Sequence, residues 1–270
     1  MGAEGSRHES HLRDRTLDEP TRGKVGAVVL AAGEGQRMGA GRPKQYLALG
    51  GRALFLHSLD FFLRLPDVDE VCLVLDRTGW EGNPRLQAGG LAQAMARRLV
   101  FAIGGARRQD SALAGLRALA KDTEIALVHD CARPFPPREP TEASIQAARE
   151  CGGAILAAPA TDTVKMAAER ERRIEQTLER SRLWLAQTPQ TFRYAPLLEA
   201  MEAAAREGVE LTDEAMAFER LGREVRIIPS TPQNLKITVP EDLRHAERVL
   251  AELEAGTKDR AVAGSQDLWI

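Results

Sequence analysis

The chain has 270 residues, with 37 Lys and Arg against 39 Asp and Glu, and a formal net charge of −2. This balance argues against a basic nucleic-acid-binding protein, and 43% hydrophobic residues are too many for a largely disordered chain. No apolar run approaches the roughly 18 residues of a membrane span, and three scattered cysteines (Cys72, Cys131 and Cys151) favour a reducing, cytoplasmic location over a disulfide framework or a zinc site.

Residues 1–22 are polar and carry both charges, which predicts a flexible N-terminal extension before a folded domain of residues 23–254 and a tail of residues 255–270. Within the domain, apolar runs of strand length alternate with amphipathic stretches. This order is typical of an α/β fold, here Rossmann-like, with a mostly parallel sheet flanked by helices on both faces. The expected strands are 25–32, 71–76, 99–103, 125–130, 154–160 and 225–230, and the expected helices are 53–64, 84–97, 109–120, 139–150, 194–206, 213–222 and 240–254.

One charged stretch, residues 161–190, breaks this alternation. Two interpretations remain open from the pattern alone. The stretch is either a solvated excursion from the domain or an arm that projects from the domain and docks on another molecule.

A glycine-rich turn follows the first expected strand, with Gly33, Gly35 and Gly39. Glycines allow close approach of the backbone and positive φ, so that successive N–H groups can point towards an anion. The spacing matches neither the P-loop nor the dinucleotide-binding fingerprint. The turn is therefore a candidate phosphate cradle, although a tight connection without a ligand is equally compatible with it.

Two cations, Arg37 and Lys44, come soon after these glycines. Arginine can hold phosphate oxygens with two parallel donors, and lysine supplies a compact point charge. Together with the glycines, the two residues indicate a polyphosphate site rather than two solvated surface cations.

The motifs resemble those of the nucleotidyltransferase family that makes CDP-linked products, and in particular the 2-C-methyl-D-erythritol 4-phosphate cytidylyltransferase family. The similar segments span roughly residues 25–250 in the family's order. They are LAAGEGQRM (30–38), PKQYLALGG (43–51), GGARRQDSALAGL (104–116), HDCARP (129–134), TDTVK (161–165), Arg180 with Trp184, QTPQ (187–190), TDE (212–214) and NLKIT (234–238).

The resemblance implies a reaction in which a substrate phosphate attacks the α-phosphorus of CTP and pyrophosphate leaves. A phosphate monoester, whose second pKa is about 6, is largely ionised at neutral pH and needs no general base. Catalysis then consists of positioning and charge neutralisation by cations, backbone N–H groups and Mg²⁺.

The resemblance also assigns roles to individual residues. It implies that Arg37, Lys44 and Lys236 are catalytic and that Ala31, Ala32 and Gly33 form the phosphate cradle. It also implies that Gly105 and Ser111 recognise the base and that Asp130 binds Mg²⁺. The residues implied to bind substrate are Asp130, Arg133, Arg180, Thr188, Thr212 and Thr238. The implied partners are CTP and a polyol phosphate, together with a second copy of the chain reached by an arm over about residues 161–187, which would make a homodimer. No membrane or nucleic-acid partner is expected.

The sequence departs from the family pattern at a few positions. Ala106 and Arg107 replace the usual Asp and Glu, which leaves side-chain contacts to the cytosine amino group in question. Cys131 and Leu30 replace Ala and Pro without loss of a functional group.

Three alternative functions remain. A ribitol 5-phosphate cytidylyltransferase would share the CTP half of the site. A glycosyltransferase would usually show a DxD metal pair, whereas Asp130-Cys131-Ala132 supplies one acid. A non-catalytic nucleotide-binding regulatory protein would have less need of the full set of cations.

Overall fold

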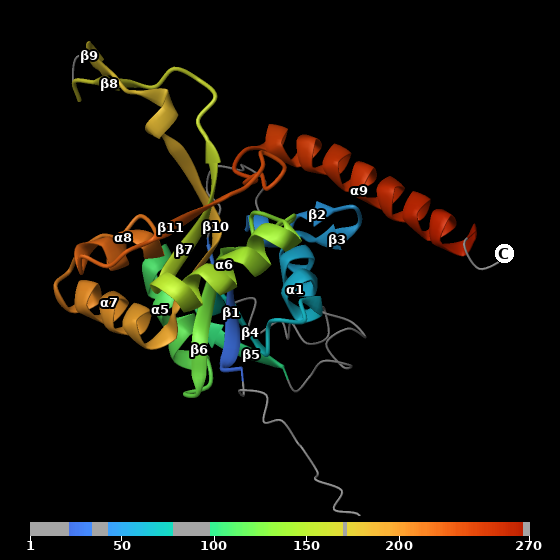
Figure 1. Cartoon of the computed structure of the whole chain (residues 1–270), viewed down its shortest axis with the longest axis horizontal. Coiled ribbons are helices and arrows are strands. Elements are labelled where there is room, and N and C mark those ends of the chain that lie inside the picture. The colour runs from blue at the N-terminus through green and yellow to red at the C-terminus, as the bar shows by residue number, and fades with distance from the viewer. Residues whose placement is uncertain (1–21, 34–42, 78–97, 170–171, 267–270) are drawn as a thin grey trace, which may run out of the picture.

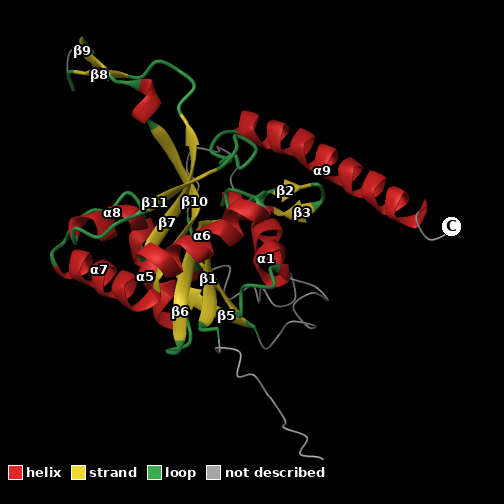
Figure 2. Cartoon of the chain, in the orientation of Figure 1, coloured by secondary structure: helices red, strands yellow, loops and turns green. Residues whose placement is uncertain are grey.

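The computed structural model describes residues 22–33, 43–77, 98–169 and 172–266, and side chains to residue 255. A seven-stranded sheet forms the centre, with strands in the order β11-β7-β10-β6-β1-β4-β5. Figure 2 shows this sheet with helices on either side. The strands of the sheet are β1 (Lys24–Ala31), β4 (Glu70–Leu75), β5 (Leu99–Ile103), β6 (Thr123–Asp130), β7 (Gly153–Pro159), β10 (Trp184–Arg193) and β11 (Arg226–Pro229).

The predicted α/β fold is confirmed, with helix boundaries mostly within one or two residues of those expected. The expected helix 84–97 lies outside the described residues. The helices are α1 (Leu54–Arg64), α5 (Arg108–Ala118), α6 (Arg138–Cys151), α7 (Tyr194–Arg206), α8 (Glu214–Arg220) and α9 (Pro240–Gln266). The short strands β2 (Ala48–Leu49) and β3 (Arg52–Ala53) pair with each other, as do β8 (Lys165–Ala167) and β9 (Ile174–Thr177).

Alternating side chains of β1 pack on the two faces of the sheet, as a strand buried on both sides requires. Val25, Ala27 and Val29 belong to a core cluster that includes residues of α1 and α6. Val28 and Leu30 belong to a second cluster that includes residues of α5, α7 and α8. Two layers of helices therefore cover the sheet (Figure 1).

The parallel strands in the middle of the sheet end together. In the register of β1 with its neighbours, Ala31 pairs with Leu75 of β4 and Leu30 pairs with Asp130 of β6. The loops that follow these strands therefore meet at one edge. In open α/β sheets, ligands bind at the carboxyl ends of the strands.

Strand β10 is the main difference from the sequence expectation. It contains the end of the charged stretch 161–190, and it lies between β6 and β7, antiparallel to both. Its buried polar side chains hide it from a search for apolar runs. Nε2 of Gln190 donates a hydrogen bond to Oδ2 of Asp213, and its Oε1 accepts one from the N–H of Ala215. The hydroxyl groups of Thr191 and Ser144 hydrogen-bond to each other. Such hydrogen bonds allow polar side chains to be buried in a sheet.

The rest of the charged stretch projects from the body as an arm that carries the β8–β9 hairpin (Figure 1). Arm residues 184–187 already belong to β10, so the projecting part is shorter than residues 161–187. At the other end of the chain, α9 continues to Gln266 rather than stopping at residue 254. Gly256 and Gly264 lie inside this helix, where each glycine costs only about 1 kcal/mol, and the helix formers Lys258, Arg260, Ala261 and Ala263 lie between them.

Candidate active site

A cavity of about 490 Å³ lies at the carboxyl ends of β1, β4, β5 and β6. Seven residues predicted for the site line it: Ala32, Gly33, Lys44, Gly105, Ser111, Asp130 and Lys236. They come from five separate chain segments, which the parallel strands bring to one edge of the sheet. Arg37, the third cation of the predicted catalytic set, lies outside the described residues.

Asp130 lies at the end of β6 between two cations. Its Oδ1 accepts a hydrogen bond from Nε of Arg108 (2.9 Å) and its Oδ2 accepts one from Nζ of Lys236 (2.7 Å). Burial opposes ionisation of the carboxyl, but the charges of Arg108 and Lys236 outweigh burial and hold the pKa of Asp130 well below its usual range. Asp130 is therefore a carboxylate at every physiological pH.

Arg108, the first residue of α5, connects Asp130 to a second acid. Its Nη1 and Nη2 donate to Oε1 and Oε2 of Glu214, at 2.8 and 3.0 Å. Burial favours the neutral form, but the carboxylates of Glu214 and Asp130 more than compensate and raise the pKa of Arg108. Both residues lie in motifs that carry the family resemblance, but the resemblance gives neither of them a role of its own.

A short 3₁₀ turn, Lys44–Tyr46, carries Lys44 into the cavity wall after Pro43. The two following side chains anchor the turn, because Gln45 Nε2 (2.9 Å) and the Tyr46 hydroxyl (3.1 Å) both donate to Oδ2 of Asp76. Burial, together with the charge of Asp76, raises the pKa of Tyr46. Asp76 follows β4 and was missed in the sequence, where a single acid after a strand gives no signal of its own.

The loop after β5 closes the cavity with Gly104 and Gly105. A Cβ on Gly104 would lie 2.3 Å from Cβ of Ala32, so only glycine fits beside the first strand. The N–H of Gly105 donates to Oγ of Ser111 at 3.2 Å. The two residues predicted to recognise the base thus lie side by side in the cavity wall.

Arg107, which replaces an acid of the family pattern, forms an ion pair at this loop. The Arg107 guanidinium donates to both carboxylate oxygens of Asp110, and its backbone N–H donates to Oδ2. This pairing holds the start of α5, where an acid also interacts favourably with the helix dipole. Arg107 therefore stabilises the loop that carries Gly105.

Besides Ala31, five described residues that were predicted for the site do not line the cavity. Arg133 donates to the carbonyl oxygens of Asn234 (2.6 Å) and Ala186 (3.2 Å), and Thr188 is buried against the end of β6. These contacts connect β6 and the segment that follows it to β10 and to residue 234, next to the cavity wall. The other three contact nearby groups: Arg180 donates to Thr161 O in the arm, Thr212 to Sδ of Met216, and Thr238 to Lys236 O. Ala31, expected in the cradle, is buried within β1.

His129 is fully buried behind Asp130. Its Nε2 lies 2.9 Å from Arg133 O and its Nδ1 lies 3.1 Å from Oγ1 of Thr188. Burial is the main cause that lowers the pKa of His129 to about 4, from an ordinary value of 6.5. The imidazole is neutral at pH 7 and holds the end of β6 by hydrogen bonds.

This burial predicts a pH-dependent stability. Since the unfolded chain protonates His129 near pH 6.5 and the folded chain only near pH 4, the free energy of unfolding falls as the pH drops through this window. The histidine contributes about 3 kcal/mol to this fall. Urea unfolding between pH 4 and 7 tests this, and the His129→Gln variant should show a shallower dependence. Parallel curves for the two proteins would contradict the prediction.

The cavity offers oxygen ligands suited to Mg²⁺. Asp76 and Asp130 are the acids that line it among the described residues, and no cluster of three or more His, Cys, Asp or Glu there could enclose a metal ion. Mg²⁺ typically uses one or two carboxylates and completes its shell with water and substrate phosphates. Asp130 therefore fits a metal that arrives with a nucleotide.

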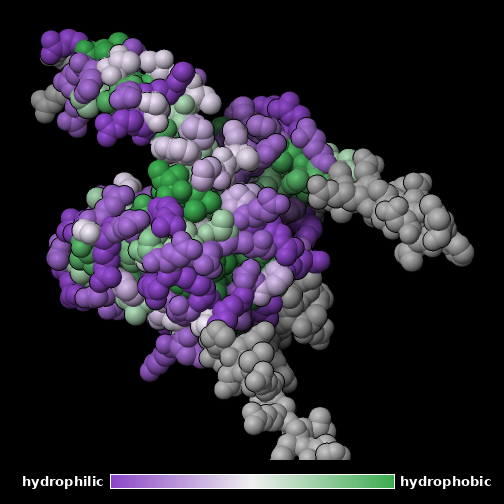
Figure 3. All heavy atoms as spheres, viewed as in Figure 1, coloured by the Kyte–Doolittle hydropathy of each residue, from purple (hydrophilic) through white to green (hydrophobic). Residues whose placement is uncertain are grey.

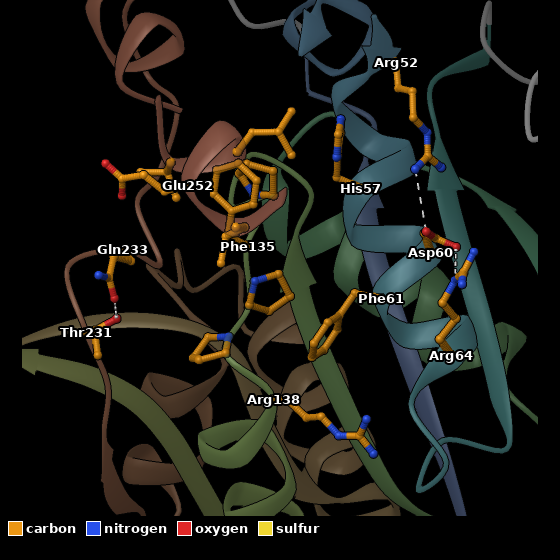
Figure 4. Close-up of a pocket in the computed structure, with 16 residues that line it drawn as sticks. Arg52, His57, Asp60, Phe61, Arg64, Phe135, Arg138, Thr231, Gln233 and Glu252 are labelled. Carbon is orange, nitrogen blue, oxygen red and sulfur yellow. Dashed lines mark hydrogen bonds and ion pairs between the residues drawn. The ribbon is translucent and has the colours of Figure 1, made fainter. Parts of the chain in front are cut away.

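A second cavity, of about 620 Å³, lies between α1, the proline-rich segment 134–137 and α9 (Figure 4). None of the described residues predicted for the site lines it. Its arginines are paired with acids: Arg52 and Arg64 with Asp60, and Arg138 with Glu142. Each arginine of this lining thus already has an acid partner, and no glycine is among the described residues that form it, so the first cavity is the better polyphosphate site.

Comparisons with known proteins agree with this geometry. A family model described as 2-C-methyl-D-erythritol 4-phosphate cytidylyltransferase matches residues 25–252. Enzymes of that name from Ectopseudomonas mendocina and Pelotomaculum thermopropionicum are each 44% identical to the chain, over 82% and 84% of its length and 93% and 94% of theirs. The crystal structure of the enzyme from Thermus thermophilus superposes with a TM-score of 0.68 at 32% identity, over 84% of this chain and 98% of that one.

Proposed function

Because the chain belongs to the 2-C-methyl-D-erythritol 4-phosphate cytidylyltransferase family, we propose that it transfers CMP from CTP to 2-C-methyl-D-erythritol 4-phosphate. The products are 4-diphosphocytidyl-2-C-methyl-D-erythritol and pyrophosphate, in the synthesis of isoprenoid precursors. The observation that carries this proposal is the cavity in which Lys44, Lys236 and the glycine loops meet at the ends of the parallel strands.

In the proposed reaction, an oxygen of the acceptor phosphate forms a bond to the α-phosphorus of CTP. The bond from that phosphorus to the bridging oxygen breaks, and its electron pair leaves with pyrophosphate. Lys44 and Lys236 neutralise charge on the phosphates, while backbone N–H groups near Gly33 position them. Gly105 and Ser111 hold the cytosine.

Asp130 and the CTP phosphate oxygens would hold Mg²⁺, which supplies positive charge to the leaving pyrophosphate. Lys236 lies beside Asp130, and its side chain is 40% exposed towards the cavity, where the phosphates would bind. The same lysine would then stabilise the reacting phosphate.

The proposed enzyme is a homodimer formed through the arm. Met166 and Ile174 on the arm are 44% and 60% exposed, and Leu185, which is 58% exposed, and Trp184 lie at the base of the arm, at the start of β10. Figure 3 shows hydrophobic atoms on this projection. Exposed apolar groups of this kind favour burial against a second copy. Arg180 lies on the same arm, so a partner's Arg180 could reach the acceptor phosphate.

The proposed location is the cytoplasm. Cys72 and Cys131 are buried free thiols, and Cys151 is also free. Such thiols persist in a reducing compartment. No helix in the described part of the chain is long and apolar enough to cross a membrane.

The arm predicts a test of assembly. Introducing charge with Ile174→Glu and Leu185→Glu should convert the dimer to a monomer, because two carboxylates would be buried unpaired in the interface. Light scattering coupled to size-exclusion chromatography measures the mass, and turnover should fall in parallel. Exchange of the exposed Leu221 on the body for Glu is the matched control. A variant that stays dimeric would contradict the proposed interface.

Pyrophosphate release tests the function itself. The protein is incubated with CTP and either 2-C-methyl-D-erythritol 4-phosphate or ribitol 5-phosphate, in Mg²⁺ and then in EDTA. We expect release with the first acceptor and in Mg²⁺ only. Faster release with ribitol 5-phosphate would change the substrate, and CTP binding without release from either acceptor would refute the enzyme assignment.

A further inference from the structure

Glu214 is a buried acid that lies close to the site but outside the cavity. Its side chain is 0% exposed, so it cannot touch a substrate. Both of its carboxylate oxygens are bound by Arg108, at 2.8 and 3.0 Å. A bidentate pair of this kind fixes the plane of the guanidinium group as well as its position.

The same guanidinium group reaches into the cavity wall. Its remaining edge donates from Nε to Oδ1 of Asp130, and Oδ2 of Asp130 accepts from Lys236. A chain of four alternating charges thus runs from Glu214 through Arg108 and Asp130 to Lys236. It connects the start of α8, the start of α5, the end of β6 and the segment before α9, which are far apart in the sequence.

This chain gives Glu214 a means of acting on the reaction. While both carboxylate oxygens of Glu214 accept hydrogen bonds from Arg108, Nε of Arg108 can point in only one direction. This Nε then fixes the position of the Asp130 carboxylate. Oδ2 of Asp130 then accepts the hydrogen bond from Nζ of Lys236 and fixes the position of this ammonium group. Without the charge of Glu214, Arg108 can tilt, and both Asp130 and Lys236 lose their fixed positions.

We propose that Glu214 is a positioning residue for cytidylyl transfer, which acts through Arg108 and Asp130 on Lys236. This rests on the proposed function and names a group that the reaction needs although no substrate touches it. Misplacement of a catalytic group by even about 1 Å can cost up to 100-fold in rate. The effect should appear in kcat, because a residue that does not touch CTP contributes little to its binding.

The first test compares two Glu→Gln variants in steady-state pyrophosphate release. Glu214→Gln should lower kcat at least tenfold and change KM for CTP less than about threefold. Glu202→Gln is the matched control, because Glu202 also pairs with an arginine of α5, Arg117, but on the surface. Equal kcat values for the two variants would overturn the proposal.

A second variant removes the concern that Glu214→Gln unfolds the protein. Replacing both members of a buried ion pair by apolar residues is often neutral or stabilising. The double variant Arg108→Met/Glu214→Met leaves no unpaired charge at position 214, although Asp130 loses its donor at Oδ1, so it should stay folded at the assay temperature but still show at least a tenfold loss in kcat. If the folded double variant has the kcat of the native protein, the ion pair of Arg108 and Glu214 is only structural and the proposal is wrong.

A double-mutant cycle tests the route through Lys236. Glu214 and Lys236 are separated by two side chains, so independent effects on kcat would multiply. We expect Glu214→Gln to cost at least tenfold in the native background but less than about threefold in the Lys236→Gln background. An equal factor in both backgrounds would overturn the proposed route.

These outcomes separate the two proposals. A native protein that releases no pyrophosphate with either acceptor refutes the proposed function and this inference with it. A native protein that turns over normally, with Glu214→Gln at the level of Glu202→Gln, refutes the inference alone.

Discussion

Lys236→Ala should lower kcat by about 10²–10³-fold while the protein stays folded. A fixed donor that stabilises charge in a transition state is typically worth this factor. The side chain of Lys236 is 40% exposed, and partly exposed ion pairs contribute about 0–1 kcal/mol to stability. Steady-state pyrophosphate release and urea unfolding, measured on the same preparation, test both parts of the prediction.

Lys121→Ala is the control for Lys236→Ala, because Lys121 is an exposed lysine just before β6, at the opposite end of that strand from Asp130. It should turn over like the native protein. Lys44→Ala should resemble Lys236→Ala, since both lysines line the same cavity. Native turnover in Lys236→Ala would mean that this cation takes no part in the reaction.

Asp130→Asn should impair both activity and stability. The exchange keeps the shape but removes the charge that Arg108 and Lys236 share. We expect kcat to fall at least 100-fold, because the lysine and the proposed metal both lose their anionic anchor. Hydrogen bonds to charged groups are worth about 1.5–3 kcal/mol, so the free energy of unfolding should fall by about this amount.

The contrast between the two variants is itself informative. Asp130 is 8% exposed and has a cation on each oxygen, whereas Lys236 reaches the solvent. A stability loss with Lys236→Ala that equals the loss with Asp130→Asn would show that the lysine is structural. Asp69→Asn, at a partly exposed carboxylate before β4, is a control for the substitution type.

The layered fold was predictable because its strands are almost uniformly apolar. All six strands of the parallel type overlap the apolar runs expected from the sequence, such as residues 125–130, since most such strands are buried on both faces. Strand β10 was not predictable in this way. Its polar residues Thr188, Gln190 and Thr191 are buried because distant partners satisfy them, and no local pattern reveals those partners.

Part of the site was predictable because local sequence patterns reveal it, as they reveal the apolar strands. Glycines and cations such as Gly33 and Lys44 have a distinctive order along the chain, and the motifs gave them roles. Glu214 and Asp76 are recognised as part of the site from their contacts with other side chains, Arg108 for Glu214 and Gln45 and Tyr46 for Asp76. Such contacts depend on the tertiary fold, so the sequence alone did not give these two acids a role.

In the proposed reaction, an already ionised phosphate attacks CTP without transferring a proton to the protein. Among the described residues that line the cavity there is no histidine, and the low pKa of Asp130 makes it a poor proton acceptor. Single-turnover CMP transfer, measured in H₂O and in D₂O near pH 8, tests this directly, because the acceptor phosphate is then fully ionised. We expect a rate ratio close to 1. A ratio above about 2 would show that a proton moves in the transition state and would contradict the proposed mechanism.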